Sequence, residues 1–135
     1  MPTEMLVLGL GAVLLLAHVL IAGNVRTRQY STDWNMGARD ETMPPLNPLA
    51  GRLVRAQANY LETLPLVIIA LVGVTLAGKA TQWTGIAAWV WLAGRAIYLP
   101  LYAAGIPKIR TLVWSIASLA MVFVLGVFLL GPVTG

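Results

Sequence analysis

Three polar residues at helical spacing stand near the middle of the chain. Arg55, Asn59 and Glu62 are separated by four and three residues. On an α-helix these spacings place the three side chains on one face. Arginine binds carboxylates well, whereas a glutamate accepts hydrogen bonds from an ammonium or amide group. The three residues therefore predict a binding site for an anion that also carries a hydrogen-bond donor.

A second polar set lies later in the chain. Arg95, Tyr98 and Tyr102 are separated by three and four residues, so they also share a helical face. Arg26 and Arg110 stand at the boundaries of two other apolar segments. Several arginines around one carboxylate suit a ligand with more than one carboxylate. An arginine beside a bound thiol would also favour the thiolate form.

The elements that must position these residues are strongly apolar. Of the 135 residues, 59% are hydrophobic and only 10% are charged, whereas soluble domains have about a quarter charged residues. Four apolar segments are long enough to span a bilayer. They predict an all-α, integral membrane four-helix bundle, with helices at about residues 5–25, 51–77, 82–102 and 110–130 and a loop at 26–50.

Composition also excludes several classes of function. The net charge of +4 is not gathered in a basic tract, so no nucleic-acid partner is expected. The chain has no cysteine and one histidine, His18, so no metal site is expected. The first apolar segment follows Glu4 and no basic residue, whereas a signal peptide begins with positive charge. Arg26 and Arg28 follow it, which predicts a retained first helix.

The distribution of basic residues predicts the topology. The second loop contains Lys79 alone, whereas the first and third loops and their flanks contain most of the basic residues. Basic loops stay in the cytoplasm, so both termini are expected on the opposite side, which is the periplasm if the host is bacterial. Both polar sets then belong to the cytoplasmic halves of their helices. At 1.5 Å per residue, Glu62 lies roughly 6 Å and Arg95 roughly 10 Å inside the boundary.

Simpler interpretations remain open for single residues. Arg26, Arg55 and Arg110 could extend to lipid headgroups. Tyr98 and Tyr102 could belong to an interfacial aromatic belt.

Glu62 and Arg95 are harder to explain in this way, because an unpaired charge at such depth costs about 2.5–3.5 kcal/mol on insertion scales. They could form a structural ion pair. His18 is expected to pack or to form a hydrogen bond within the first helix. Ser115 and Ser118 are expected to bond to carbonyls of their own helix. Interfacial and lipid-facing positions are expected for Trp83, Trp89, Trp91 and Trp114.

Three segments of the chain resemble signatures of a known family. Residues 55–65, RAQANYLETLP, resemble the second-helix signature of the MAPEG family, membrane-associated proteins in eicosanoid and glutathione metabolism. Residues 94–98, GRAIY, with Tyr102 resemble its third-helix signature, and Arg110 matches its last arginine. Residues 24–28, NVRTR, resemble the end of its first helix. The resemblance covers nearly the whole chain and implies a single domain over residues 1–135 of a bacterial-type member.

The resemblance implies a homotrimer that binds glutathione, as cosubstrate, between neighbouring subunits near the cytoplasm. Arg110 would stabilise the glutathione thiolate, with Tyr102 as an alternative or a helper. Arg26 of the adjacent subunit would be a further contact. The residues implied in holding glutathione are Arg55, Asn59, Glu62, Arg95, Tyr98 and Tyr102.

Two departures from the leukotriene-forming member of the family affect this assignment. Thr63 replaces a tyrosine, and the turn between Tyr102 and Arg110 is one residue longer. The loop at residues 34–48 is also unlike that of the mammalian synthases.

The activity that the resemblance implies is that of a glutathione transferase or peroxidase. Its second substrate would be a lipophilic electrophile or a lipid hydroperoxide from the bilayer. A small multidrug-type transporter is an alternative, because four short helices and one buried glutamate fit that class. Its cation pore would be acidic, however, whereas most charges in these helices are basic. A third possibility is a non-catalytic glutathione-binding membrane protein.

Overall fold

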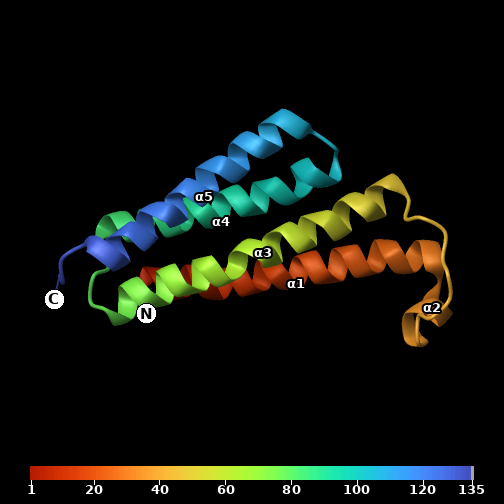
Figure 1. The fold of residues 1–135 in the computed structure, drawn as a ribbon, viewed down its shortest axis with the longest axis horizontal. Coiled ribbons are helices and arrows are strands. Elements are labelled where there is room, and N and C mark those ends of the chain that lie inside the picture. The colour runs from red at the N-terminus through yellow and green to blue at the C-terminus, as the bar shows by residue number, and fades with distance from the viewer. Residues whose placement is uncertain (135) are drawn as a thin grey trace.

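In the computed structural model, which describes residues 1–134, the chain folds as five helices (Figure 1). They are α1 (Thr3–Tyr30), α2 (Thr32–Met36), α3 (Pro48–Leu76), α4 (Gln82–Ala103) and α5 (Pro107–Leu130). All but the short α2 are long and apolar enough to cross a membrane. Large apolar side chains cover their outer surfaces, as at Val13 and Leu119, which are 62% and 66% exposed. The protein is therefore an all-α, integral, multi-pass membrane protein.

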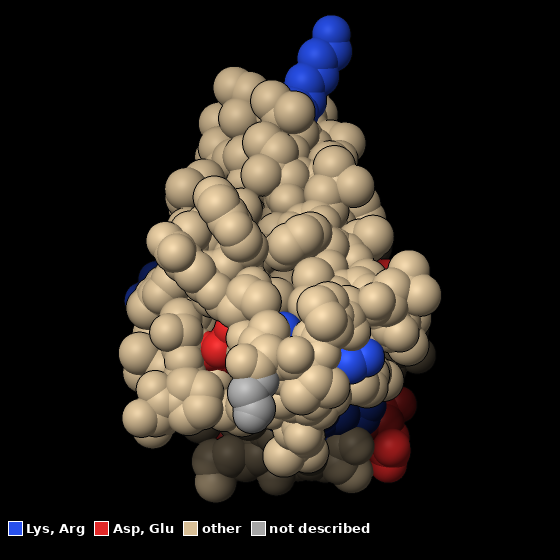
Figure 2. All heavy atoms as spheres, turned by 90° about the vertical axis from the view of Figure 1, so that its left-hand side faces the viewer, with Lys and Arg blue, Asp and Glu red and all other residues tan. Residues whose placement is uncertain are grey.

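The four long helices run side by side and give the bundle two distinct ends. The terminal end contains both termini and the loop 77–81, whereas the loop end contains the connections 31–47 and 104–106 (Figure 1). Seen from the terminal end, the surface is mostly uncharged (Figure 2). This arrangement places the first and third connections of the four-helix chain at the same end, as the sequence predicts.

The helix boundaries differ from the expected ones mainly at the loop end. The first helix was expected to end near residue 25 but continues to Tyr30, and α2 forms within the expected loop. The chain from Arg26 to Tyr30 contains good helix formers and no proline or glycine. α3 begins earlier than expected because Asn47 caps it. The Asn47 side chain accepts a hydrogen bond from the Ala50 amide at 2.8 Å.

Local signals end and restart the other helices. Gly78 and Gly105 have φ angles of 67° and 75°, which glycine adopts readily at the end of a helix. Thr81 and Thr84 form a capping box at the start of α4. Pro107 occupies the first turn of α5, where its missing N–H is not needed, so α5 starts three residues before Arg110.

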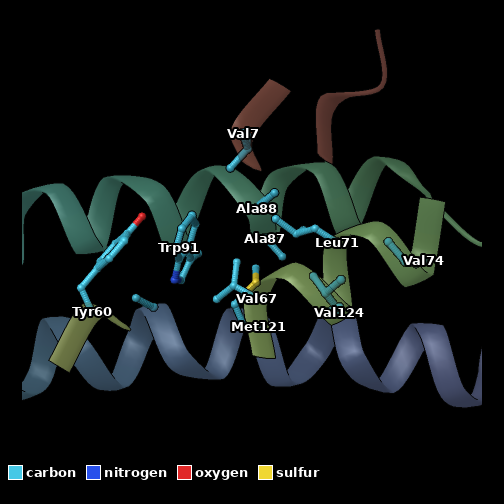
Figure 3. Packing of buried hydrophobic residues seen from close by; sticks show 12 residues of the cluster. Val7, Tyr60, Val67, Leu71, Val74, Ala87, Ala88, Trp91, Met121 and Val124 are labelled. Atoms are coloured by element: carbon cyan, nitrogen blue, oxygen red, sulfur yellow. The ribbon is translucent and has the colours of Figure 1, made fainter. Parts of the chain in front are cut away.

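The core lies between α3, α4 and α5 with the beginning of α1 against it (Figure 3). Trp91 is 2% exposed and extends into this core beside Tyr60. The expected interfacial position of Trp91 is therefore wrong. Gly11 explains its burial, because a Cβ there would lie 2.9 Å from the Trp91 ring. Trp83 and Trp89, at 66% and 43% exposed, do face outward as expected.

Close packing of α4 on α5 depends on Gly94. A Cβ at Gly94 would lie 2.9 Å from the Cβ of Ala117. We expect Gly94→Ala to lower the free energy of unfolding by about 1–3 kcal/mol, since the helices must separate or strain. Thermal unfolding in detergent measures this change. Gly126→Ala is the matched control, because its new Cβ would meet no atom of residues 1–134 within 4 Å beyond its chain neighbours and the adjacent backbone of its own helix. Equal unfolding midpoints for the two variants would contradict the prediction.

Candidate functional site

A polar cleft lies at the loop end between α3, α4 and α5. Its volume is about 320 Å³. Asn59 of α3 forms one side, and two tyrosines of α4 and the first turns of α5 form the others. The lining residues are Asn59, Tyr98, Tyr102, Arg110, Thr111 and Trp114. The cleft thus brings together four of the site residues that the sequence predicts.

Arg110 reaches the cleft despite the longer turn before α5. The helix begins at Pro107, so Arg110 belongs to its first turn. The Arg110 guanidinium carbon lies 4.4 Å from the centre of the Tyr102 ring, a cation–π arrangement. Tyr102 in turn meets the Tyr98 ring edge-to-face at 5.6 Å between centroids. The cleft therefore has a cation held by aromatic contacts beside the positive end of the α5 dipole.

Trp114 is a part of the cleft that the sequence analysis missed. Its Nε1 donates a hydrogen bond to Oδ1 of Asn59 at 3.1 Å and so joins α5 to α3. Thr111 was missed as well. The signal was present in the spacing, because Trp114 follows Arg110 by four residues and shares its helical face. Trp114 was instead expected to face the lipid or the interface.

Arg95 is buried without an ionic partner. It is 1% exposed, and none of its guanidinium nitrogens has a hydrogen-bond partner. Its guanidinium carbon lies 4.4 Å from the centre of the Tyr98 ring and 5.4 Å from that of Tyr60. Glu62 is exposed on α3. The alternative of a Glu62–Arg95 ion pair is therefore wrong within one chain.

A smaller space of about 160 Å³ lies next to the cleft and is mainly apolar. Arg95, Thr63, Ser118 and Trp114 contribute its polar groups. Trp114 lines both this pocket and the cleft. Arg95 faces the pocket and is not among the residues that line the cleft.

A buried aromatic column lies behind Arg95. His18 is 1% exposed and stacks on Tyr60 with 4.8 Å between ring centroids. Neither ring nitrogen of His18 has a hydrogen-bond partner, so the packing expectation is confirmed and the hydrogen bond is not. The Tyr60 hydroxyl donates to the Gly11 carbonyl. This hydrogen bond fixes the Tyr60 ring, over which Arg95 lies. Sequence reasoning did not single out Tyr60.

The remaining predicted residues lie outside the cleft of a single chain. Arg55 and Glu62 are exposed on α3, on the same helical face as Asn59. Arg26 is on α1, where its guanidinium lies 5.5 Å from the centre of the Trp34 ring. Among residues 1–134, α1 packs against α2, α3 and α4 but not against α5. A single chain therefore does not bring Arg26 to Arg110.

The serines of α5 divide between two roles. Ser115 donates to the Thr111 carbonyl at 2.8 Å, as expected. Ser118 lines the smaller pocket.

The sequence profile of the MAPEG family matches residues 5–130 of the 135-residue chain. The chain belongs to the MAPEG family. No curated protein and no solved structure matched it. The MAPEG match includes almost all of the four long helices and therefore both polar sets. Membership in the MAPEG family indicates a membrane protein with a role related to glutathione.

Proposed function

We propose that this protein is a glutathione-dependent membrane enzyme that conjugates or reduces lipophilic electrophiles. The observation that carries the proposal is the position of Arg110. This residue, in the first turn of α5, faces the polar cleft and stacks on Tyr102 of α4. MAPEG membership supports glutathione as the ligand of this cleft. The electrophile or lipid hydroperoxide would reach it from the bilayer, which accounts for a polar site within a membrane protein.

Arg110 supplies the chemistry that a thiol substrate requires. A free thiol is mostly protonated at neutral pH, and the thiolate is the nucleophile. Arginine does not act as a base, but its charge stabilises an adjacent thiolate. The N-terminus of α5 adds positive potential at the same position. Tyr102 can donate a hydrogen bond to the same sulfur and is the alternative stabilising group.

The proposed glutathione site continues from the cleft along the exposed face of α3. Arg55 binds a glutathione carboxylate, Glu62 binds its ammonium group, and Asn59 lies between them. Tyr98 and Tyr102 form the wall opposite, and Arg95 stabilises the ligand from behind Tyr98. Exposed charges on a membrane helix need a partner.

A neighbouring subunit would cover this face of α3 and the glutathione bound on it. Arg26 of a second copy would complete the site, because α1 of the same chain lies apart from the cleft. We propose that the assembly is the homotrimer that the family resemblance implies. A monomeric mass in detergent at working concentration would contradict a shared site.

We propose that the loop end faces the cytosol of a bacterial cell, from which glutathione enters, and that both termini are periplasmic. The basic residues at that end support this orientation. Alkaline phosphatase fused after Gly135 is expected to be active, because the enzyme folds only outside the cytoplasm. An inactive phosphatase fusion, together with a fluorescent fusion of green fluorescent protein at the same position, would mean that the topology is the reverse of the proposed one.

Calorimetry and turnover together test the proposed function. The detergent-solubilised protein is expected to bind glutathione and to conjugate it to 1-chloro-2,4-dinitrobenzene or to reduce cumene hydroperoxide. Binding without turnover would indicate a non-catalytic glutathione-binding protein. Neither binding nor turnover, with proton-coupled efflux from vesicles, would indicate a transporter.

A further inference from the structure

The terminal end of the bundle holds a buried carboxylate. Glu4, in the first turn of α1, is only 3% exposed. Its Oε1 accepts a hydrogen bond from the hydroxyl of Thr84, which is itself fully buried, at 2.6 Å. This contact joins the start of α1 to the start of α4. A buried carboxylate normally requires several donors or a cation.

The Thr84 hydroxyl and the N-terminus of α1, in whose first turn Glu4 lies, compensate its charge only in part. The Thr84 hydroxyl has one proton, and the Thr81 carbonyl is within its reach at 2.8 Å as well as the carboxylate. Residues 1–25 and 111–134 contain no lysine or arginine. Lys79, in the adjacent loop 77–81, donates instead to the Phe128 carbonyl at 2.9 Å. The Glu4 carboxylate therefore lacks a cationic side chain.

Glu4 also lines a pocket large enough for a ligand group. The pocket has a volume of about 450 Å³ and is formed by the start of α1, the loop 77–81 and the first turns of α4. Thr3, Thr81 and Gln82 contribute further polar side chains to its wall. Ile86 and Trp89, which are 44% and 43% exposed, form the side that faces outward.

We propose that this pocket binds a primary ammonium group at the membrane boundary, with Glu4 as its counter-ion. An ammonium group donates three hydrogen bonds, and the carboxylate, two threonine hydroxyls and the Gln82 amide offer acceptors for them. A divalent metal is disfavoured, because no cluster of three histidine or acidic side chains occurs in residues 1–134. A quaternary ammonium is disfavoured as well, because it binds in cages of several aromatic rings and Trp89 is the one ring in this wall.

Two sources can supply the ammonium group. The outward-facing Ile86 and Trp89 favour the headgroup of an ethanolamine phospholipid, since acyl chains would lie along these side chains. A soluble amine is the other source. Neither depends on glutathione binding at the opposite end of the bundle.

Native mass spectrometry of the detergent-purified protein tests the proposal. The wild type is expected to retain phosphatidylethanolamine on the order of tenfold better than phosphatidylcholine or phosphatidylglycerol, because it alone of the three lipids carries a primary ammonium group. Glu4→Gln, which keeps the side-chain shape, should abolish that preference. Glu41→Gln is the matched control, because it removes a carboxylate from the exposed loop at the other end.

A second variant separates ligand loss from misfolding. Gln82 is exposed, so Gln82→Lys should fold normally and place an ammonium of the protein itself beside the pocket. It is expected to lose the same lipid preference. Glu4-dependent binding of free ethanolamine without lipid preference would support the ammonium site and identify the soluble source. Equal binding of all three lipids and of ethanolamine by wild type and Glu4→Gln would overturn the proposal.

Discussion

Arg110→Ala is expected to lower glutathione turnover on the order of 10²-fold while glutathione affinity changes little. The variant removes the charge that faces the cleft beside Tyr102, so the thiolate loses its main electrostatic stabilisation. The binding contacts on α3 remain. Steady-state kinetics with a generic electrophile measure the rate. Ultraviolet difference spectra of bound glutathione measure how much thiolate forms.

The neighbouring Lys108→Ala is the matched control for this variant. Lys108 is exposed in the same first turn of α5 and is not among the residues that line the cleft, so its loss should leave both readouts unchanged. Arg110→Lys should recover part of the rate, because it restores the charge without the planar fork of donors. Unchanged turnover in Arg110→Ala, with an inactive Tyr102→Phe, would transfer the role of thiolate stabilisation to the tyrosine.

Arg55→Ala and Glu62→Ala are each expected to weaken glutathione binding by about 2–5 kcal/mol. In the proposed homotrimer a neighbouring subunit covers this face of α3, so each change leaves a charged partner on the ligand unpaired where water is scarce. Isothermal titration calorimetry in detergent gives both dissociation constants. Because the two residues bind opposite charges of one ligand, the double variant should lose less than the sum of the single losses.

Exposed residues away from the site provide controls for these variants. Arg28→Ala and Glu41→Ala remove one positive and one negative charge at the same end of the bundle, and both should leave glutathione affinity unchanged. Wild-type affinity in both Arg55→Ala and Glu62→Ala would mean that the ligand binds elsewhere or is a different molecule.

The sequence predicts the four spans and the faces that carry the polar residues, because both follow from helix geometry. Spacings of three and four residues place Tyr98 with Tyr102 and Arg110 with Trp114 whatever the tertiary packing is. The start of α5 was less predictable. Because Pro107 starts the helix early, Arg110 lines the cleft in spite of the longer turn.

The remaining differences come from the direction that a side chain faces around its helix, which depth along the helix does not determine. Glu62 and Arg95 were expected at a similar depth, yet Glu62 is exposed and Arg95 faces Tyr60 and Tyr98. The burial of Trp91 depends on the absence of a side chain at Gly11, on a helix far away in sequence. Such pairs depend on tertiary packing, so composition favoured an interfacial tryptophan instead.

Trp114 has a consequence for the order in which two reactants bind. Its indole forms part of the wall of the 320 Å³ cleft and of the 160 Å³ pocket, and its position is fixed by the hydrogen bond to Asn59. A molecule in the cleft that displaces the indole from Asn59 Oδ1 changes the shape of the neighbouring pocket. Thermodynamic reciprocity then requires that occupancy of the pocket change affinity in the cleft by the same factor. In a two-substrate enzyme built on this wall, the apparent affinity for either substrate therefore depends on the concentration of the other.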